Sequence, residues 1–149
     1  MRQNAMEYLR PTDWALLENR SERMRFKLGE EIIHAGARLH EIFVIRRGSA
    51  SVELGGAYSS MVMSTLCEGD VCGELAFLSD GISTASVVAK DIEVEVDAFN
   101  IYHLRELCEE VPGFGLRLYR FLGGCLAERV KCTSSELIRA LNRCNGSRV

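Results

Sequence analysis

The fold is decided by Gly69-Asp70-Val71-Cys72-Gly73-Glu74-Leu75-Ala76-Phe77-Leu78, followed closely by Thr84-Ala85-Ser86-Val87-Val88-Ala89. This stretch joins a glycine-rich turn, an acidic residue, a short apolar helical turn and a hydroxyl-rich loop that enters a strand. Gly73 permits a positive φ or a close approach of another backbone segment. Residues 74–78 can form one helical turn, whose first amides lack a partner inside the helix and suit an anion. The stretch therefore predicts an anion-binding turn.

Three hydroxyl side chains follow the turn, on Ser83, Thr84 and Ser86, and each could donate a hydrogen bond to a phosphate oxygen. Glu74 cannot serve a phosphate directly, because both groups are negative, but it can accept from a sugar hydroxyl. The simpler interpretation is a helix-capping glutamate in an ordinary turn. The length of the whole pattern favours a site for a phosphate joined to a sugar.

The composition is that of a globular protein, with 149 residues, of which 47% are hydrophobic and 26% charged. This length favours a single domain over residues 1–149 with a sizeable core. The net charge of −3 gives no basic signature for nucleic acid. No apolar run is long enough for a secretory signal or for the roughly 20 residues that span a bilayer. We therefore expect a cytoplasmic protein without direct membrane insertion.

Six cysteines occur, at positions 67, 72, 108, 125, 132 and 144, without a CxxC pair. Free thiols in a reducing cytoplasm are the favoured interpretation. A zinc site formed by Cys67, Cys72 and one of the histidines is the alternative, but its spacing gives it poor support. We expect no metal.

Short strands are predicted from Phe26 to about Phe99, where turn residues separate runs rich in β-branched and aromatic side chains. Residues 50–54 alternate and lead into Gly55-Gly56, which suits a hairpin. Residues 93–97 alternate cleanly, as a half-exposed strand should. Many short strands at regular spacing indicate a sandwich or barrel.

Helices are predicted on both sides of the strands. Residues 12–25 read as a short helix capped by Thr12 or Asp13, and Asn100 could cap a helix over 101–110. Residues 114 to about 141 read as one long or broken helix, in which Leu118, Leu122 and Leu126 recur at helical spacing. Gly123-Gly124 inside it indicates either a weak point or close packing against the strands or a second subunit.

This order of elements resembles the cyclic nucleotide-binding domain family from about residue 12 to 132. The motifs that carry the resemblance are Phe26-x-x-Gly29-Glu30-x-Ile32-Ile33-x-x-Gly36, Ile42-Phe43-Val44-Ile45-x-x-Gly48-x-x-x-Val52, and Gly69-Asp70 with the stretch that follows it. The resemblance implies an α+β, mainly β fold, an antiparallel, jelly-roll-like β-roll. A short N-terminal helix, a cassette helix and C-terminal helices would flank it. The roll would occupy about 26–99 and the C-terminal helical part about 100–141.

The resemblance also implies the ligand site, which in this family is a phosphate-binding cassette. It places Glu74 at the ribose 2′-hydroxyl of a cyclic nucleotide. The other implied ligand-binding residues are Gly73, Leu75 and Ala76 beside sugar and phosphate, Ser83 and Thr84 in the phosphate loop, and Val71, Cys72 and Ser86 near the base. No catalytic residue, metal or required cofactor is implied.

Ser83 departs from the family pattern, which has an arginine there. Loss of this charge-assisted phosphate contact should cost about 1.5–3 kcal/mol, or on the order of 10- to 100-fold in affinity. Arg46, Arg47 or Lys90 could replace the charge from a neighbouring strand.

Two functions follow from these observations. The first is a regulatory domain that binds cyclic AMP or cyclic GMP and signals through its C-terminal helix to an effector protein or domain. The alternative is a degenerate β-roll that serves protein interaction or dimerisation without a nucleotide. An enzyme is not expected, because no order of nucleophile, histidine and acid stands out.

The long C-terminal helix is the predicted homodimer surface, through Leu118, Leu122 and Leu126 beside Gly123-Gly124. The competing interpretation is that this face only covers the β-roll. About 17 residues follow Cys132, too few for the helix-turn-helix module of the family's transcription factors, so no nucleic acid partner is expected.

Overall fold

The structure is a computed structural model that describes residues 7–56 and 59–146. Its elements in chain order are α2 (Pro11–Glu18), β1 (Ser21–Lys27), β2 (Glu31–Ile33), β3 (Glu41–Arg47), β4 (Ala50–Gly56), β5 (Ser59–Leu66), β6 (Val71–Cys72), α3 (Glu74–Leu78), β7 (Ser86–Ala89), β8 (Glu93–Asn100), α4 (Ile101–Glu110) and α5 (Phe114–Gly146).

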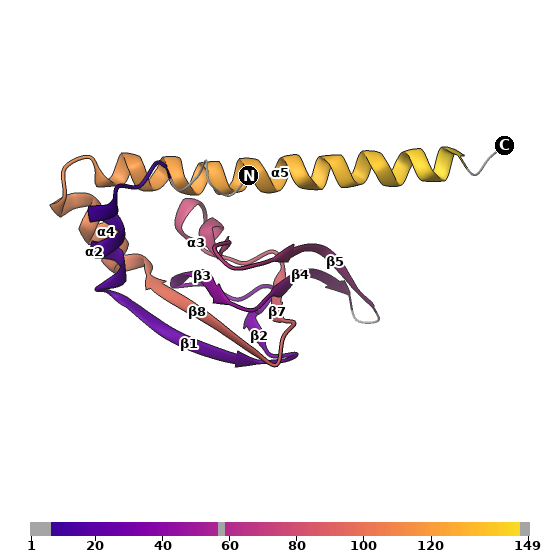
Figure 1. Cartoon of the computed structure of the whole chain (residues 1–149), viewed down its shortest axis with the longest axis horizontal. Helices are drawn as coiled ribbons and strands as arrows, with labels where there is room; N and C mark the ends of the chain where they lie inside the picture. The colour runs from indigo at the N-terminus through magenta and orange to yellow at the C-terminus, as the bar shows by residue number, and fades with distance from the viewer. Residues whose placement is uncertain (1–6, 57–58, 147–149) are drawn as a thin grey trace.

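The strands form two antiparallel sheets, in the orders β1-β8-β3-β6 and β2-β7-β4-β5. Figure 1 shows α2, α4 and the start of α5 gathered at one end of this roll, while α5 runs over α3 and continues past the strands. The predicted α+β, mainly β fold with an antiparallel β-roll is confirmed. Among the described residues, no helix is both long and apolar enough to cross a membrane.

Strand β3 explains how the molecule is layered, because its four apolar residues from Ile42 to Ile45 are all buried. Successive side chains of a strand point to opposite faces. Phe43 and Ile45 lie in the core between the two sheets, and Ile42 and Val44 lie in the core beneath the helices. The sheet that contains β3 is therefore covered on both faces.

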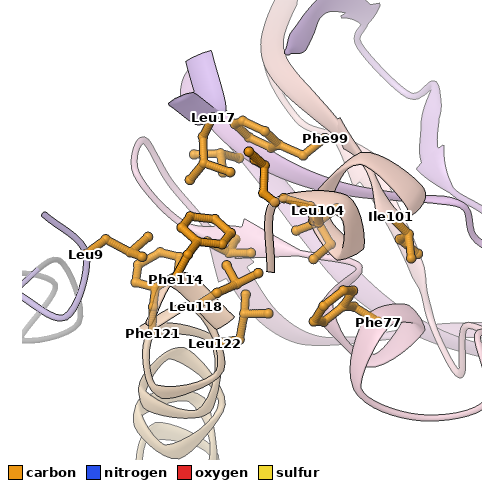
Figure 2. Packing of buried hydrophobic residues seen from close by; sticks show 14 residues of the cluster. Leu9, Leu17, Phe77, Phe99, Ile101, Leu104, Phe114, Leu118, Phe121 and Leu122 are labelled. Carbon is orange, nitrogen blue, oxygen red and sulfur yellow. The ribbon is translucent and has the colours of Figure 1, made fainter. Parts of the chain in front are cut away.

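Half of the buried residues in the core beneath the helices come from α4 and α5 (Figure 2). Leu118 and Leu122 are 3% and 1% exposed, and both belong to this core. Trp14 of α2 packs edge-on against Phe121, with ring centroids 5.4 Å apart. Asp13 fixes the same junction, because its carboxylate accepts from Arg117 Nε at 2.7 Å and Nη2 at 2.9 Å.

The N-terminal helix is shorter than predicted, since α2 ends at Glu18 and residues 21–25 belong to β1. Met24 and Phe26 are half-buried while Arg23 and Arg25 are exposed, a period of two that suits a strand. Thr12 and Asp13 are not the N-cap: Arg10 is, and its amide donates to Asp13 Oδ2 at 2.9 Å. The prediction for Asn100 is confirmed, because its side chain accepts from the Tyr102 amide at 2.8 Å.

The long helix is unbroken from Phe114 to Gly146, so Gly123-Gly124 does not interrupt it. Of the predicted homodimer surface, Leu118 and Leu122 are buried against the roll and are not available to a partner, while Leu126 is half-buried. That the helix mediates homodimerisation stays a prediction. An apolar helix face is evident from sequence spacing, but the spacing does not show what covers that face.

Candidate phosphate-binding cassette

Gly73 sets the geometry of the cassette, because it turns the chain from β6 into α3 with a φ of 82°. This left-handed conformation disfavours any residue that has a Cβ. A Cβ placed on Gly73 would also lie 3.0 Å from the backbone oxygen of Glu41. The turn and the close approach predicted for Gly73 are therefore both present.

Glu74, the first residue of α3, is 1% exposed, although it carries a carboxylate. Its Oε1 accepts a hydrogen bond from Nη1 of Arg129, and Nη2 of Arg129 donates to the backbone oxygen of Val71. Its Oε2 is buried, and no hydrogen-bond partner for it lies among the described residues. A buried acceptor without a partner is costly, and a hydrogen bond donated to this oxygen would remove that cost.

Arg129 was missed by sequence reasoning as a site residue, although a signal for it exists. It stands at helical spacing from Leu122 and Cys125, on the apolar face of α5 that packs against the roll. A charged residue on a buried face needs a partner. Its partner Glu74 lies 55 residues away in the chain, so a local sequence pattern cannot reveal this ion pair.

The hydroxyl-rich loop pairs with the turn that follows β2. The Ser83 amide donates to Ala37 O at 3.0 Å, and Ser83 O accepts from the Gly36 amide at 2.8 Å. The Ser83 hydroxyl donates to Ala85 O at 2.6 Å, and Ser86 Oγ accepts from the Ala35 amide at 3.1 Å. Thr84 is exposed.

The two parts of the cassette, the turn at Gly73 and the hydroxyl-rich loop that leads into β7, are linked through β2. A Cβ on Gly73 would lie 3.5 Å from Cδ1 of Ile33, and β2 pairs with β7, where Ile33 stands opposite Val87. Val71 and Cys72 are buried beneath the turn, and Leu75 is exposed on α3. Ala76 contributes its backbone to α3.

Two of the three cations suggested as substitutes for the missing arginine are engaged elsewhere. Arg46 pairs with Asp97, and Lys90 pairs with Glu53 at 2.9 Å. Arg47 is exposed at the end of β3. Arg38 is the cation tied to the cassette loop, since its Nη1 donates to Asp80 O at 3.1 Å. It stands opposite Ile82 in an isolated bridge, one residue before Ser83.

Two thiols lie near the buried ion pair of Glu74 and Arg129. Burial, reinforced by the carboxylate of Glu74, raises the pKa of Cys125 to about 11 and raises the pKa of Cys72 as well. Both are therefore neutral packing groups at neutral pH. Among residues 7–56 and 59–146, no group of three or more His, Cys, Asp or Glu side chains could hold a metal ion.

Residues 23–110 match the cyclic nucleotide-binding domain family, which is more than half of the chain. The chain belongs to the cyclic nucleotide-binding domain family, whose members are regulatory binding domains.

Named relatives agree with this assignment, and a solved structure shares the fold. The chain is 26% identical to cyclic GMP-binding protein C of Dictyostelium discoideum, over 90% of this chain and 5% of that protein. It is 33% identical to the cAMP-dependent protein kinase regulatory subunit of Hypocrea atroviridis, over 77% of this chain and 24% of that protein. A cyclic nucleotide-binding domain from Methylobacillus flagellatus has the same fold, with a TM-score of 0.80, 16% identity and coverage of 89% of this chain and 74% of that one. The chain thus spans a small part of these two relatives.

Proposed function

We propose that this chain binds a cyclic nucleotide in the cassette and reports the binding through α5. The observation that supports this most strongly is Glu74 Oε2, a buried acceptor without a partner among the described residues, beside the glycine turn. A ribose 2′-hydroxyl is a donor of the right kind for it. The phosphate would then lie toward Ser83 and Thr84, with Val71, Cys72 and Ser86 nearer the base.

The proposed ligand is cyclic AMP or cyclic GMP. One relative is named for cyclic GMP and another for cAMP-dependent regulation. Both nucleotides share the ribose and the cyclic phosphate that the cassette would hold, so the sugar and phosphate contacts do not separate them.

The proposed signal starts at Arg129. Its guanidinium holds the Glu74 carboxylate and the Val71 carbonyl together, so it ties α5 to the cassette. A ribose hydroxyl on Oε2 would change the hydrogen bonding of the same carboxylate and so change how firmly Arg129 is held. α5 would pass this change to an effector protein or domain, or to a second copy of the chain. The six unpaired cysteines suit the reducing cytoplasm that we propose as its location.

A second function is favoured by two specific observations. The family arginine is replaced by Ser83, whose hydroxyl already donates to Ala85 O, and Glu74 already has a counter-charge in Arg129. A β-roll in which these two cassette residues already have partners within the chain could serve assembly without a nucleotide.

Calorimetric titration separates the two functions. We expect wild type to bind cyclic AMP or cyclic GMP weakly, and Ser83→Arg to bind on the order of 10- to 100-fold more tightly, because a guanidinium again faces the phosphate. The 2′-deoxy nucleotide should bind roughly 10-fold less tightly to both proteins, since it cannot donate to Glu74. The sensor function fails if neither protein binds at millimolar concentration while both remain folded.

A further inference from the structure

The segment that builds the cassette, residues 67–89, carries only negative charge. It contains no lysine, arginine or histidine, and its charged side chains are Glu68, Asp70, Glu74 and Asp80. A cyclic phosphate is itself an anion, so an excess of carboxylates disfavours it, whereas an uncharged ligand is not repelled. The charge of this segment therefore bears on which class of ligand the site prefers.

Other segments bring Arg129 and Arg38 to the cassette, and both guanidinium groups are engaged there. Arg129 donates to Glu74 Oε1 and to the backbone oxygen of Val71, so its charge is spent on the carboxylate beside it. Arg38 donates to the backbone oxygen of Asp80 at 3.1 Å, beside that residue's own carboxylate. These two cations therefore offset existing negative charge and do not add a positive charge for a phosphate.

Ser83, at the position of the family arginine, already donates both of its protons within the chain. Its amide donates to Ala37 O at 3.0 Å, and its hydroxyl donates to Ala85 O at 2.6 Å. A phosphate oxygen is an acceptor and needs a donor from the protein, but the Ser83 hydroxyl oxygen has only lone pairs left to offer. Ser83 in this conformation therefore suits a ligand that donates a hydrogen bond.

Glu74 makes the same demand on the ligand. The side chain is 1% exposed, and its Oε2 is an acceptor without a hydrogen-bond partner among the described residues. A ribonucleoside has free hydroxyls at its 2′, 3′ and 5′ positions, and each of them can donate. A cyclic nucleotide keeps the 2′-hydroxyl alone, because its phosphate esterifies the other two oxygens. Acceptors at Glu74 and Ser83 therefore match a nucleoside with more hydrogen bonds than a cyclic nucleotide.

The thiols near Glu74 respond to the same electrostatic bias. Burial, aided by the carboxylates of Glu74 and Asp70 and opposed by Arg129, raises the pKa of Cys125 to about 11. Burial and the same charged groups raise the pKa of Cys72 as well. A thiolate is an anion, so surroundings that disfavour it also disfavour a buried phosphate. The two carboxylates thus outweigh Arg129 in their effect on a nearby negative charge.

We propose that the cassette of this chain takes an uncharged purine ribonucleoside in preference to a cyclic nucleotide. This inference rests on the proposed function for the place of the sugar at Glu74, and it changes the class of ligand. The 2′-hydroxyl donates to Glu74 Oε2. The 3′- and 5′-hydroxyls lie toward Ser83 and Thr84, where a cyclic phosphate would otherwise lie, and they need no counter-charge there.

Calorimetric titration of the full chain with adenosine, guanosine, cyclic AMP and cyclic GMP compares the two classes. We expect the better nucleoside to bind at least about 10-fold more tightly than either cyclic nucleotide, as the loss of one or two hydroxyl hydrogen bonds implies. Equal or tighter binding of a cyclic nucleotide overturns the nucleoside preference and leaves the proposed function intact. Binding of a nucleoside alone supports the preference and overturns cyclic nucleotide sensing. If none of the four binds the folded chain at millimolar concentration, both proposals fail.

An added charge tests whether electrostatics set the preference. Ser83→Arg should tighten cyclic nucleotides on the order of 10- to 100-fold and leave nucleosides nearly unchanged, so that the order of affinities reverses. Ser135→Arg is the matched control, because Ser135 is exposed on α5 and the same charge there should alter neither affinity. Circular dichroism checks that both variants stay folded. Nucleosides that gain as much as cyclic nucleotides from Ser83→Arg contradict the proposal.

The salt dependence of wild type gives the same information without any substitution. Salt screens the repulsion between the carboxylates and a phosphate, so added sodium chloride should tighten any cyclic nucleotide binding and leave nucleoside binding unchanged. Cyclic nucleotide binding that weakens with salt would show a net attraction for the phosphate and would overturn the proposal.

Discussion

At the scale of single residues, the carboxylate of Glu74 is buried, and burying a charged group costs free energy. One of its oxygens accepts a hydrogen bond from Arg129, and the other has no hydrogen-bond partner among the described residues. Replacing a buried ion pair by apolar residues is often neutral, but removing one partner leaves an uncompensated charge. The pair therefore makes the cassette and α5 depend on each other.

Removing Arg129 should destabilise the protein strongly. We expect Arg129→Met to lower the free energy of unfolding by about 3–5 kcal/mol, because Glu74 would keep its charge without a partner. Glu74→Gln added to this variant should recover part of the loss, since an amide needs no counter-charge. Urea denaturation measures both effects. Arg139→Met, which replaces an exposed arginine on the same helix, should stay within about 0.5 kcal/mol of wild type. Equal effects of the two methionine variants would show that the buried pair does not stabilise the fold.

At the scale of elements, glycine plays opposite parts at the start of α3 and inside α5. Gly73 has a left-handed backbone and a carbonyl 3.0 Å from where its Cβ would be. Gly123 lies inside a regular helix, and outside the backbone of that helix no described atom lies within 4 Å of where its Cβ would be. Substitution by alanine should therefore change the stability of the protein in opposite directions at the two positions.

Alanine substitution tests this contrast. Gly73→Ala should destabilise by at least about 1–3 kcal/mol, through backbone strain and the contact with Glu41. Gly123→Ala should stabilise the single chain by about 0.5–1 kcal/mol, because alanine loses less backbone entropy in a helix. Urea unfolding of both variants measures these changes in stability. A stabilised Gly73→Ala variant would contradict the cassette geometry.

At the scale of the whole molecule, two buried aspartates fasten helices and strands to one another. Hydrogen bonds from Arg117 lower the pKa of Asp13, which joins α2 to α5. Burial alone would raise the pKa of Asp97, but hydrogen bonds from Arg23 and Arg46 outweigh it and lower that pKa. Asp97 thereby joins β8 to β1 and β3.

Stability should consequently fall in acid. Because both folded-state pKa values lie below the unfolded value of about 3.9, their stabilisation is fully present above about pH 5 and is lost as the pH falls through the folded pKa values. Urea denaturation between pH 6 and pH 3 should show this decline. The double variant Asp13→Asn, Asp97→Asn should be less stable at pH 6 and lose less on acidification. Parallel pH profiles for the two proteins would exclude these aspartates as the cause.

The sequence predicted what local patterns determine. Gly73 and residues 74–78 form the predicted turn and short helix, and the alternation holds from residue 93 to 96 of β8, whereas Asp97 is buried and breaks the half-exposed pattern. Contacts between residues that are distant in the chain could not be predicted from local sequence patterns. β1 carries many charged residues and becomes a strand through its register with β8, and Arg129 acquires its role from Glu74. That residues 1–149 form one domain stays a prediction.

Cys125 is partly buried on the face of α5 that packs against the core, so its reactivity can report movement of this helix. Reaction with a thiol-specific reagent needs both access and the thiolate, and a pKa of about 11 leaves very little thiolate at pH 8. Cys132, two turns further on, is exposed. In the absence of ligand we expect Cys132 to be modified rapidly and Cys125 slowly, as mass spectrometry of timed samples would show. Any ligand or substitution that separates α5 from the cassette should raise the labelling rate of Cys125 and leave that of Cys132 unchanged. The labelling rate of Cys125 therefore measures how often α5 separates from the cassette.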